Sequence, residues 1–404
     1  MTALRIATWP EPVTSLTKRI VIAGGGISGY VAAKRIVDGI KANGVDAEVT
    51  VVNKDPYHFM PPLFFDVALG YGTPDDTRAP IQNMEKYGIN VKVDEIQSID
   101  AANRTVVGKT GKYQYDYLVV ALGIDYGWSA YPGLDKEGVH NYDLDGAIKM
   151  KEALNQVKDG QNITILIPEL PFRCGIYPYE AATALSAFFR ARNKKVSIRL
   201  IDPMPQPIAP LGPSISRFIK EQLEQYGVEY VPNSKFREID ASKKAVITSS
   251  GEFKYDLLVK VPPPRLPKAL ADSGEDFVFK QDPRWTPVLP NARHPKYDDI
   301  YLVGEHALPP LGIGLAGVFV ESLAITASTN LLGDLIGGYG PAFAPSPVSC
   351  VGYAGEKGWA GTCELPFDPA KGTYTMKCYF TGVYSIGRLL KQAFYHGWID
   401  GLKF

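Results

Sequence analysis

Three glycines, Gly24, Gly26 and Gly29, constrain the fold of this chain more than any other feature. They form the pattern GxGxxG in the segment GGGISG, directly after the apolar run 19–23, RIVIA. A helix to about residue 41 and a second strand at 48–52 are predicted to follow, which makes a βαβ unit. There the first glycine permits a tight turn, the second lets a pyrophosphate approach the backbone, and the third lets helix and strand pack closely. The sequence therefore predicts a dinucleotide site with the phosphate at the helix N-terminus.

The residues around these glycines predict how the nucleotide is held. Ile27 and Ser28 lie between the second and third glycine, at the start of the helix. The acidic residue expected after the second strand, which would bind the ribose hydroxyls, is replaced by Asn53, followed by Lys54. Asparagine can still hydrogen-bond a hydroxyl, but more weakly than a carboxylate. We therefore expect other contacts to hold part of the nucleotide.

Two later segments return to this first domain. Segment 115–123, YDYLVVALG, predicts a strand that ends in a turn at Ala121 and Gly123. Segment 299–305, DIYLVGE, predicts another strand, which ends at Gly304 and Glu305 and leads to a helix from about Gly314.

Between these two segments lies a second predicted βαβ unit, with strands at 162–167 and 195–202 and a helix around 179–192. The fold class is therefore α/β, with two Rossmann-like dinucleotide-binding domains, the second inserted in the first, and a C-terminal amphipathic helical tail. The expected segments are a first nucleotide-domain part, a second domain, a return segment and a C-terminal region: 19–155, 156–285, 286–340 and 341–404.

Composition excludes several classes of function. Lysine and arginine number 43 and aspartate and glutamate 43, so no net charge attracts the chain to nucleic acid. Trp9, Pro10 and Pro12 interrupt the leader, so we expect no signal peptide and a cytoplasmic protein. Glu321 interrupts the longest apolar stretch, so no transmembrane span is expected. Cysteine and histidine do not cluster with metal-ligand spacing, and no metal is expected.

The four cysteines form two groups with different expected roles. In a reducing compartment a chain of 404 residues has little need of structural disulfides. Cys363 and Cys378 are therefore expected to be small buried hydrophobic residues. Cys174 and Cys350 stand in segments that suggest chemistry instead.

The order GGGISG, YDYLVVALG, DIYLVGE resembles the FAD-binding signatures of the flavoprotein disulfide reductase superfamily, over residues 19 to about 335. The second βαβ unit carries PELPFRCGIYPYE in place of a second GxGxxG, so the site for a nicotinamide nucleotide looks lost. The segment PFRCGIYPYE is similar to the active-cysteine segment of sulfide:quinone oxidoreductases and flavocytochrome c sulfide dehydrogenases. In that family a glutamate follows the cysteine by six positions, as Glu180 follows Cys174. The second cysteine matches Cys350 in SPVSCVGYAGEKG.

The resemblance implies an FAD enzyme that oxidises sulfide to polysulfide or sulfane sulfur. Sulfide would attack a disulfide between Cys174 and Cys350, and electrons would pass through FAD to a membrane quinone. Glu180 would accept the proton. Alternatively, it could be a carboxylate in the first turn of a helix that only interacts favourably with the helix dipole. The helix from about Gly314 would direct its positive end at the flavin, with Gly312 allowing close approach.

Departures from the family bear on the mechanism. The cysteines that link flavin covalently in relatives are missing from GIDYGWSAYPGL and PYHFMPPLFFDVALG, so FAD is expected to bind noncovalently. Glu305 replaces the usual aspartate, and the run 309–312, PPLG, replaces Pro-Lys-x-Gly, which removes a lysine near the flavin. His306 could relay protons or be a structural donor, and His58 could line the flavin's dimethylbenzene edge or belong to a simple apolar loop.

The last 25 residues predict an amphipathic helix or two short helices from residue 380 to 404. Polar residues, among them Thr381 and Arg388, form one narrow stripe, and a broad aromatic surface that includes Trp398 surrounds it. This surface must bury against the protein's own body, a second subunit of a homo-oligomer, or a membrane that supplies quinone. The membrane reading places the protein peripherally on the cytoplasmic side of the cell membrane.

Three other functions stay open. Electrons could pass to a cytochrome, as in flavocytochrome relatives. NADH could be the donor, as in type II NADH dehydrogenases. FAD could also be structural in a binding protein without catalysis, if Glu305 and the absent lysine mean lost activity.

Overall fold

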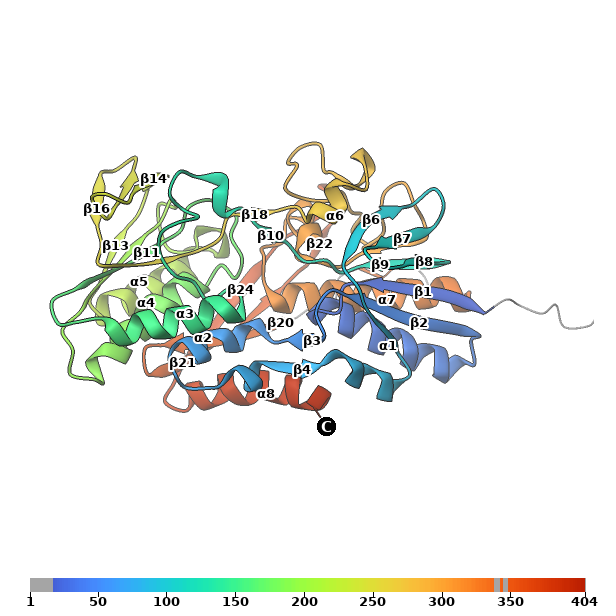
Figure 1. Ribbon diagram of the computed structural model, residues 1–404, viewed down its shortest axis with the longest axis horizontal. Helices are drawn as coiled ribbons and strands as arrows, with labels where there is room; N and C mark the ends of the chain where they lie inside the picture. The colour runs from blue at the N-terminus through green and yellow to red at the C-terminus, as the bar shows by residue number, and fades with distance from the viewer. Residues whose placement is uncertain (1–16, 338–341, 344–347, 404) are drawn as a thin grey trace, which may run out of the picture.

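A computed structural model of the protein describes residues 17–337, 342–343 and 348–403, without the side chains of residues 381, 387 and 388. The leader with Trp9, Pro10 and Pro12 lies outside the described residues, as do the side chains of Thr381 and Arg388 in the predicted polar stripe. The protein has a mixed α/β fold, and its two sheet-containing halves lie side by side along the long axis (Figure 1).

The first half is built on a five-stranded sheet in the order β19-β9-β1-β2-β5, with all neighbouring strands parallel. Its strands are β1 (Lys18–Ala23), β2 (Ala47–Asn53), β5 (Asn90–Val93), β9 (Tyr117–Val120) and β19 (Ile300–Leu302). Strand β19 follows the whole second half in sequence and still pairs with β9. Segments some 180 residues apart therefore end at the same edge of one sheet.

Two helices pack together beside this sheet, α1 (Ile27–Asn43) and α7 (Gly317–Ile336). Their approach depends on Gly39, because a Cβ atom there would lie 2.4 Å from Cδ1 of Leu332. Helix α1 ends at Gly44, whose φ of +62° is the left-handed conformation that glycine adopts easily. The predicted helix after the GGGISG turn is confirmed by α1.

The second half has a four-stranded parallel sheet in the order β13-β12-β11-β17. Its elements are α3 (Leu144–Gln156), β11 (Asn162–Leu166), α4 (Tyr177–Arg190), β12 (Ser197–Ile201), α5 (Pro213–Gln225), β13 (Val228–Val231) and β17 (Leu257–Lys260). Strand β11, helix α4 and strand β12 form the predicted second βαβ unit. Alanines and Phe189 of α4 are buried against the sheet.

Smaller strands and helices lie outside the two parallel sheets. They are β3 (Tyr57–Phe59), α2 (Phe64–Ala68), β4 (Arg78–Pro80), β6 (Ile96–Asp100), β7 (Thr105–Gly108), β8 (Lys112–Gln114), β10 (Asp125–Tyr126), β14 (Phe236–Asp240), β15 (Ala245–Thr248), β16 (Glu252–Lys254), β18 (Pro264–Arg265), α6 (Lys268–Ala271), β22 (Phe367–Asp368) and β23 (Thr373–Tyr374). Strands β10 and β18 pair with each other across the two crossings between the halves.

The C-terminal region differs from the predicted helical tail. It forms a three-stranded antiparallel sheet, β20 (Val348–Ala354), β21 (Lys357–Glu364) and β24 (Lys377–Tyr384), before the helix α8 (Gly387–Lys403) begins. The prediction of helix from residue 380 was therefore wrong for 380–384. These residues pair with β21, and cross-strand pairing decides their conformation over the local helical period.

Helix α8 runs along one long edge of the molecule, beside β4 (Figure 1). Its C-terminal end is fixed to the first half, where Asn83 Nδ2 donates to the carbonyl of Leu402 at 2.9 Å and the Tyr87 hydroxyl donates to that of Gly401 at 2.8 Å. Within 17–337, 342–343 and 348–403, no helix has the length and apolar character needed to cross a bilayer.

Candidate functional site

A cavity of about 360 Å³, which we call the cofactor cavity, opens at the carboxyl edge of the first sheet. Nine residues predicted to bind a dinucleotide line it: Gly24, Gly26, Ile27, Ser28, Asn53, Lys54, Ala121, Gly123 and Glu305. Its wall thus combines the turns after β1, β2, β9 and β19, which meet because parallel strands end together. Asp94, Gln97 and Arg173 also line it.

The glycine turn fits a close-lying phosphate. Gly24 has φ +104°, and a Cβ atom there would lie 2.4 Å from the carbonyl oxygen of Ala121. Gly26 precedes α1, and a Cβ atom on it would meet nothing within 4 Å, so its space is open toward a ligand. The first turn of α1 carries no acidic residue that would repel a phosphate. These features match a pyrophosphate cradle.

Asn53 acts on the glycine turn itself. Its Oδ1 accepts from the Gly25 N–H at 2.8 Å, and its Nδ2 donates to the carbonyl of Asp55 at 2.9 Å. His58 supports the same turn, since its Nδ1 lies 2.8 Å from the carbonyl oxygen of Gly25. His58 therefore holds the loop, and Tyr57 and Phe59 on either side of it line the cofactor cavity instead.

Three predicted cofactor residues lie outside the cavity wall. Gly29 serves helix packing, since a Cβ atom there would lie 1.9 Å from the carbonyl oxygen of Gly24. Gly304 similarly permits close approach to Gly123, whose backbone nitrogen would be 2.9 Å from such a Cβ. Gly314 lines a different cavity, and its N–H contacts the sulfur of Met376 at 3.4 Å.

The helix predicted to start near Gly314 begins three residues later, at Gly317. Gly312 has φ +77°, and a Cβ atom there would lie 2.9 Å from the carbonyl of Tyr374, so this turn packs on the C-terminal region. The chain makes a left-handed turn at Gly312, and helix α7 begins only after it, at Gly317. Gly317, at the N-terminus of α7, lines the cofactor cavity and is the residue that brings this helix end to it.

Arg173 forms an ion pair with Glu305, the residue that departs from the family pattern. Its Nε lies 3.0 Å from the Glu305 carboxylate, and its guanidinium also donates to the hydroxyl of Tyr126. Burial raises the pKa of Glu305 while Arg173 opposes that rise. Burial lowers the pKa of Arg173, but Glu305 and Tyr126 outweigh it, so the net pKa is raised and the guanidinium stays charged. The sequence interpretation missed Arg173, although it directly precedes Cys174.

A second, smaller cavity of about 120 Å³, the cysteine chamber, adjoins the cofactor cavity and shares Arg173, Glu305 and Gly317 with it. Both Cys174 and Cys350 line this chamber. The two cysteines, 176 positions apart in sequence, are thus brought to one small space beside the cofactor cavity. In the structure they are free thiols, not the expected disulfide.

The backbone at Cys174 is strained. It has φ +57°, the left-handed region that residues with a Cβ atom seldom occupy. Its N–H donates to the carbonyl of Leu315 at 2.8 Å, and its carbonyl accepts from the Tyr177 N–H at the start of α4. These bonds hold the cysteine between the second half and the segment before α7. Such strain is often found at functional sites.

Both thiols are hard to ionise. Burial raises the pKa of Cys350 to about 11, Glu180 adds to the rise, and Lys391 opposes it. Burial raises the pKa of Cys174 further, and Cys350 and Glu180 add to it. Because only the thiolate is nucleophilic, both cysteines should react slowly as thiols at neutral pH.

Glu180 forms a buried ion pair that the sequence interpretation did not include. Its Oε1 lies 2.6 Å from Nζ of Lys391 on α8 and accepts from the Tyr353 N–H at 3.0 Å. Burial lowers the pKa of Lys391, but Glu180 and Asp66 raise it more, so the ammonium stays protonated. Glu180 is also a first-turn residue of α4. Its carboxylate therefore has a charged partner. An interaction with the helix dipole alone does not account for this contact.

A further carboxylate, Glu321, lines the cysteine chamber from the second turn of α7. Burial raises its pKa, and no charged partner in the described part of the chain opposes that rise. A carboxyl group with a raised pKa can exchange protons near neutral pH. No sequence signal marked Glu321 as functional, because it stands in an apolar helix.

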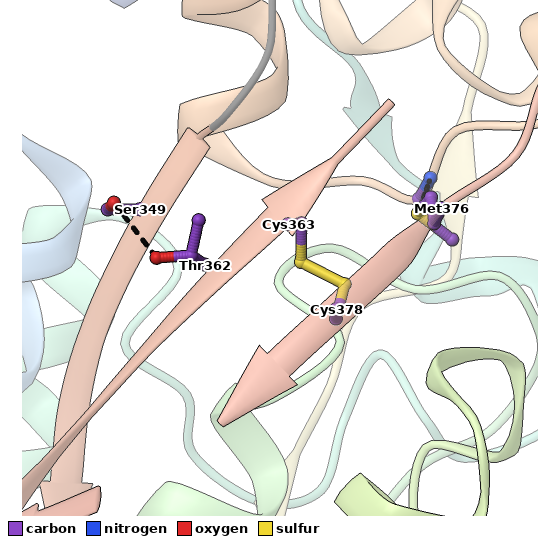
Figure 2. Close-up of a disulfide and its surroundings, with 6 residues drawn as sticks. Ser349, Thr362, Cys363, Met376 and Cys378 are labelled. Atoms are coloured by element: carbon purple, nitrogen blue, oxygen red, sulfur yellow. Dashed lines mark hydrogen bonds between the residues drawn. A yellow bond between two sulfur atoms is a disulfide. The ribbon is translucent and has the colours of Figure 1, made fainter. Parts of the chain in front are cut away.

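A third cavity of about 430 Å³, the apolar cavity, adjoins the cysteine chamber on the side away from the cofactor cavity. Cys174 and Cys350 line both spaces. Cys363 and Cys378 also line the apolar cavity, and they form a disulfide between β21 and β24 with a Cα–Cα distance of 4.0 Å (Figure 2). The expectation that these two are unpaired was wrong, because strand pairing sets them directly opposite each other.

His306 lines neither the cofactor cavity, nor the cysteine chamber, nor the apolar cavity. It is fully buried, and neither ring nitrogen has a hydrogen-bond partner among the described residues. Burial lowers the pKa of His306 to about 3, so the ring is neutral at pH 7. Across the described ranges, no group of three histidine, cysteine or acidic side chains is arranged to hold a metal ion.

These observations define a dinucleotide-binding oxidoreductase of two α/β halves with a cysteine pair beside its cofactor cavity. The chain belongs to the pyridine nucleotide-disulphide oxidoreductase family, whose model matches residues 18–261. The family implies a flavin cofactor, and the glycine turn and Glu305 fit FAD.

Individual relatives agree with the resemblance seen in the sequence. The mitochondrial sulfide:quinone oxidoreductase of Dictyostelium discoideum is 25% identical over 88% of this chain and 81% of its own length. The structure of the sulfide:quinone oxidoreductase from Aquifex aeolicus superposes with a TM-score of 0.81 at 20% identity, covering 96% of this chain and 91% of that one. A type II NADH:quinone oxidoreductase of Mycobacterium tuberculosis is 23% identical over 77% of this chain and 72% of its own length. The predicted resemblance to sulfide:quinone oxidoreductases is confirmed.

Proposed function

We propose that this chain is a sulfide:quinone oxidoreductase that uses noncovalent FAD and the Cys174 and Cys350 pair. The observation that carries the proposal is that both cysteines line one small chamber beside the cofactor cavity. The likeness to sulfide:quinone oxidoreductases supports it. The proposal includes two Rossmann-like domains, the second inserted in the first.

In the proposed reaction the pair begins as a disulfide. Hydrosulfide attacks the sulfur of Cys174, a persulfide forms there, and Cys350 leaves as a thiolate. Cys350 is the better leaving group because its pKa is raised less than that of Cys174. Bound FAD would accept the two electrons and pass them to the quinone. A second hydrosulfide removes the outer sulfur of the persulfide as polysulfide and leaves Cys174 as a thiolate, and the two electrons are given up as the Cys174–Cys350 disulfide re-forms.

Charged residues of the chamber support these steps. Lys391 stabilises the Cys350 thiolate, because its charge lowers the pKa of that thiol. Glu180 fixes Lys391 in place through the 2.6 Å ion pair. Glu321 has a raised pKa and no ion-pair partner among the described residues, so we assign it the proton released by hydrogen sulfide. Glu180 stays a candidate for this proton, but its pairing with Lys391 favours Glu321.

The route for quinone starts on α8. Phe394 lines the cysteine chamber and is also 43% exposed, so the outer apolar surface of this helix continues into the chamber. Leu389 on the same helix is 67% exposed, and Ile386, in the turn just before the helix, is 68% exposed. We propose that this surface rests peripherally on a membrane and admits quinone.

Replacement of the chamber cysteine tests the function. Cys350→Ser should lower quinone reduction by sulfide by about 100-fold or more, because no disulfide can form. Ser349→Ala is the matched control, since Ser349 is the preceding residue and its hydroxyl faces Thr362 on the neighbouring strand, 3.3 Å away (Figure 2). Unchanged turnover in Cys350→Ser would remove the proposal.

NADH oxidation is the second candidate, because a type II NADH:quinone oxidoreductase is among the relatives. The turn after β11 disfavours it. That turn, 167–176, reads IPELPFRCGI and has a single glycine, so it does not provide the GxGxxG cradle. Turnover with NADH that equals turnover with sulfide would favour this candidate.

A further inference from the structure

The apolar cavity gathers all four cysteines of the chain. Cys174 comes from the turn before α4, Cys350 from β20, Cys363 from β21 and Cys378 from β24. Two of them are free thiols and two form a disulfide. A thiol and a disulfide that share one enclosed space can exchange if their sulfur atoms approach.

Strand register sets three of these cysteines on the same face of the C-terminal sheet. Cys350 pairs with Gly361, and Cys363 lies two residues further along β21. Cys378 pairs directly with Cys363. Side chains two residues apart on a strand, and those of directly paired residues, point to the same side. The three sulfur atoms therefore face the apolar cavity together.

Cys350 and Cys363 are diagonal neighbours on adjacent strands, for which a Cα–Cα separation of about 7 to 8 Å is typical. A disulfide needs a Cα–Cα distance below about 7 Å, so a small shift of the strands would bring the two sulfur atoms together. Two features allow this shift. Gly361, directly opposite Cys350, places no side chain in the way, and the register of β21 with β24 is irregular between Ala360 and Gly361.

We propose that Cys363–Cys378 is a second redox-active disulfide, which exchanges with the Cys174 and Cys350 thiols through a Cys350–Cys363 mixed disulfide. The Cys350 thiolate attacks the sulfur of Cys363, a bond forms between them, and Cys378 leaves as a thiolate. The Cys174 thiolate then attacks Cys350, and Cys363 leaves. The result is a Cys174–Cys350 disulfide with two thiols at 363 and 378. The two protons move from the first pair to the second, and no electron leaves the protein.

The exchange gives the chamber pair the oxidation state that it needs to react with a nucleophile. The free thiols of Cys174 and Cys350 are converted to a disulfide without an external oxidant. The second pair then holds the reducing equivalents within the apolar cavity. This step is independent of the proposed function, because it needs neither sulfide nor quinone.

A two-cysteine variant tests the mixed disulfide directly. In the full chain carrying Cys174→Ser and Cys378→Ser, Cys350 and Cys363 are the only cysteines. We expect oxidised glutathione to link them, seen by mass spectrometry of the joined peptides. The matched variant with Cys350→Ser and Cys378→Ser leaves Cys174 and Cys363, and it should link at least about tenfold more slowly if Cys350 is the attacking thiol. Equal linking in both variants, or none in the first, would overturn the proposal.

The unaltered chain supplies a second measurement, in case the variant does not fold. The protein is equilibrated in graded glutathione buffers without sulfide or quinone, its thiols are blocked with N-ethylmaleimide, and its linked peptides are identified. Molecules with one disulfide should include both the 363–378 and the 174–350 linkage. If they carry only the 363–378 linkage, that disulfide is structural and the inference is wrong. Failure here would leave sulfide oxidation by the 174–350 pair standing, and failure of sulfide oxidation would leave this result standing.

Discussion

A buried ammonium group, that of Lys391, lowers the pKa of both chamber thiols and so opposes the effect of burial. Lys391 is 4% exposed at its side chain and lies in the same chamber as Cys174 and Cys350. The sequence lacks the lysine that family members carry after their last FAD segment, since that run reads PPLG here. Lys391 offers a cation from a different element, helix α8. Its replacement should therefore change the reactivity of the thiols.

Alkylation of Cys350 measures this effect. The pKa of the Cys350 thiol is near 11, and only the thiolate reacts with iodoacetamide. The reaction rate should therefore rise about tenfold for each pH unit from 7 to 10. Lys391→Met should slow the reaction at each pH by about threefold or more, since the pKa rises further, and Lys391→Arg should restore it. Lys260→Met is the control, because Lys260 is a buried lysine that does not line the chamber. Equal rates in all four proteins would show that Lys391 is only a structural tether.

At the scale of single residues, sequence motifs selected glycines that the structure places at the cofactor cavity and two cysteines that it brings into one chamber. They could not predict Arg173, Lys391 or Glu321. Each of these acts through a partner or cavity distant in sequence, which the pattern of its own segment does not show, even for Arg173 beside Cys174. The partner of Asn53 was also missed, because its contact with Gly25 depends on how β1 and β2 end side by side.

Helix α8 has two ends with different surroundings. Toward its C-terminus Ile399 and Leu402 are fully buried against the first half. Leu389 and Phe394 nearer its start are exposed, as is Ile386 just before the helix. The predicted apolar surface of the tail is thus partly buried on the protein's own body. Its remaining part is available for a membrane or for a second copy of the chain.

Substitution on the exposed part of α8 separates these two occupants. Leu389→Asp should reduce binding to phospholipid vesicles by about tenfold, because a charged group replaces an apolar one at the lipid boundary. Leu289→Asp is the control, since Leu289 is another exposed leucine, 40% exposed, outside this helix. Cosedimentation with vesicles gives the binding, and size-exclusion chromatography gives the oligomeric state. Unchanged vesicle binding with a shift from dimer to monomer would identify the surface as a subunit interface.

Elements were predicted where a local period or a turn motif decided them. The βαβ units around α1 and α4 are of this kind, because short apolar strands on either side of a helical segment are local signals. The end of β24 was predicted as helix because Thr381 fits the helical spacing of the polar residues that follow it, whereas pairing with β21 makes this segment a strand. The same pairing joins Cys363 to Cys378, so the error in the element and the error in the disulfide have one cause.

At the scale of the whole molecule, the proposed function depends on three adjoining cavities. The cofactor cavity, the cysteine chamber and the apolar cavity follow one another, and Cys174 and Cys350 line the last two. Sequence order predicted that the return strand would rejoin the first sheet, and β19 does so. The cavities themselves could not be predicted, because their walls come from both halves and from the C-terminal sheet.

An anaerobic titration of the FAD-loaded protein tests the central claim most directly. Sulfide should bleach the flavin absorbance in the unaltered chain and fail to do so in Cys350→Ser, and NADH should leave the absorbance unchanged on the same time scale. Bleaching by sulfide that does not depend on Cys350, or faster bleaching by NADH than by sulfide, would contradict the account.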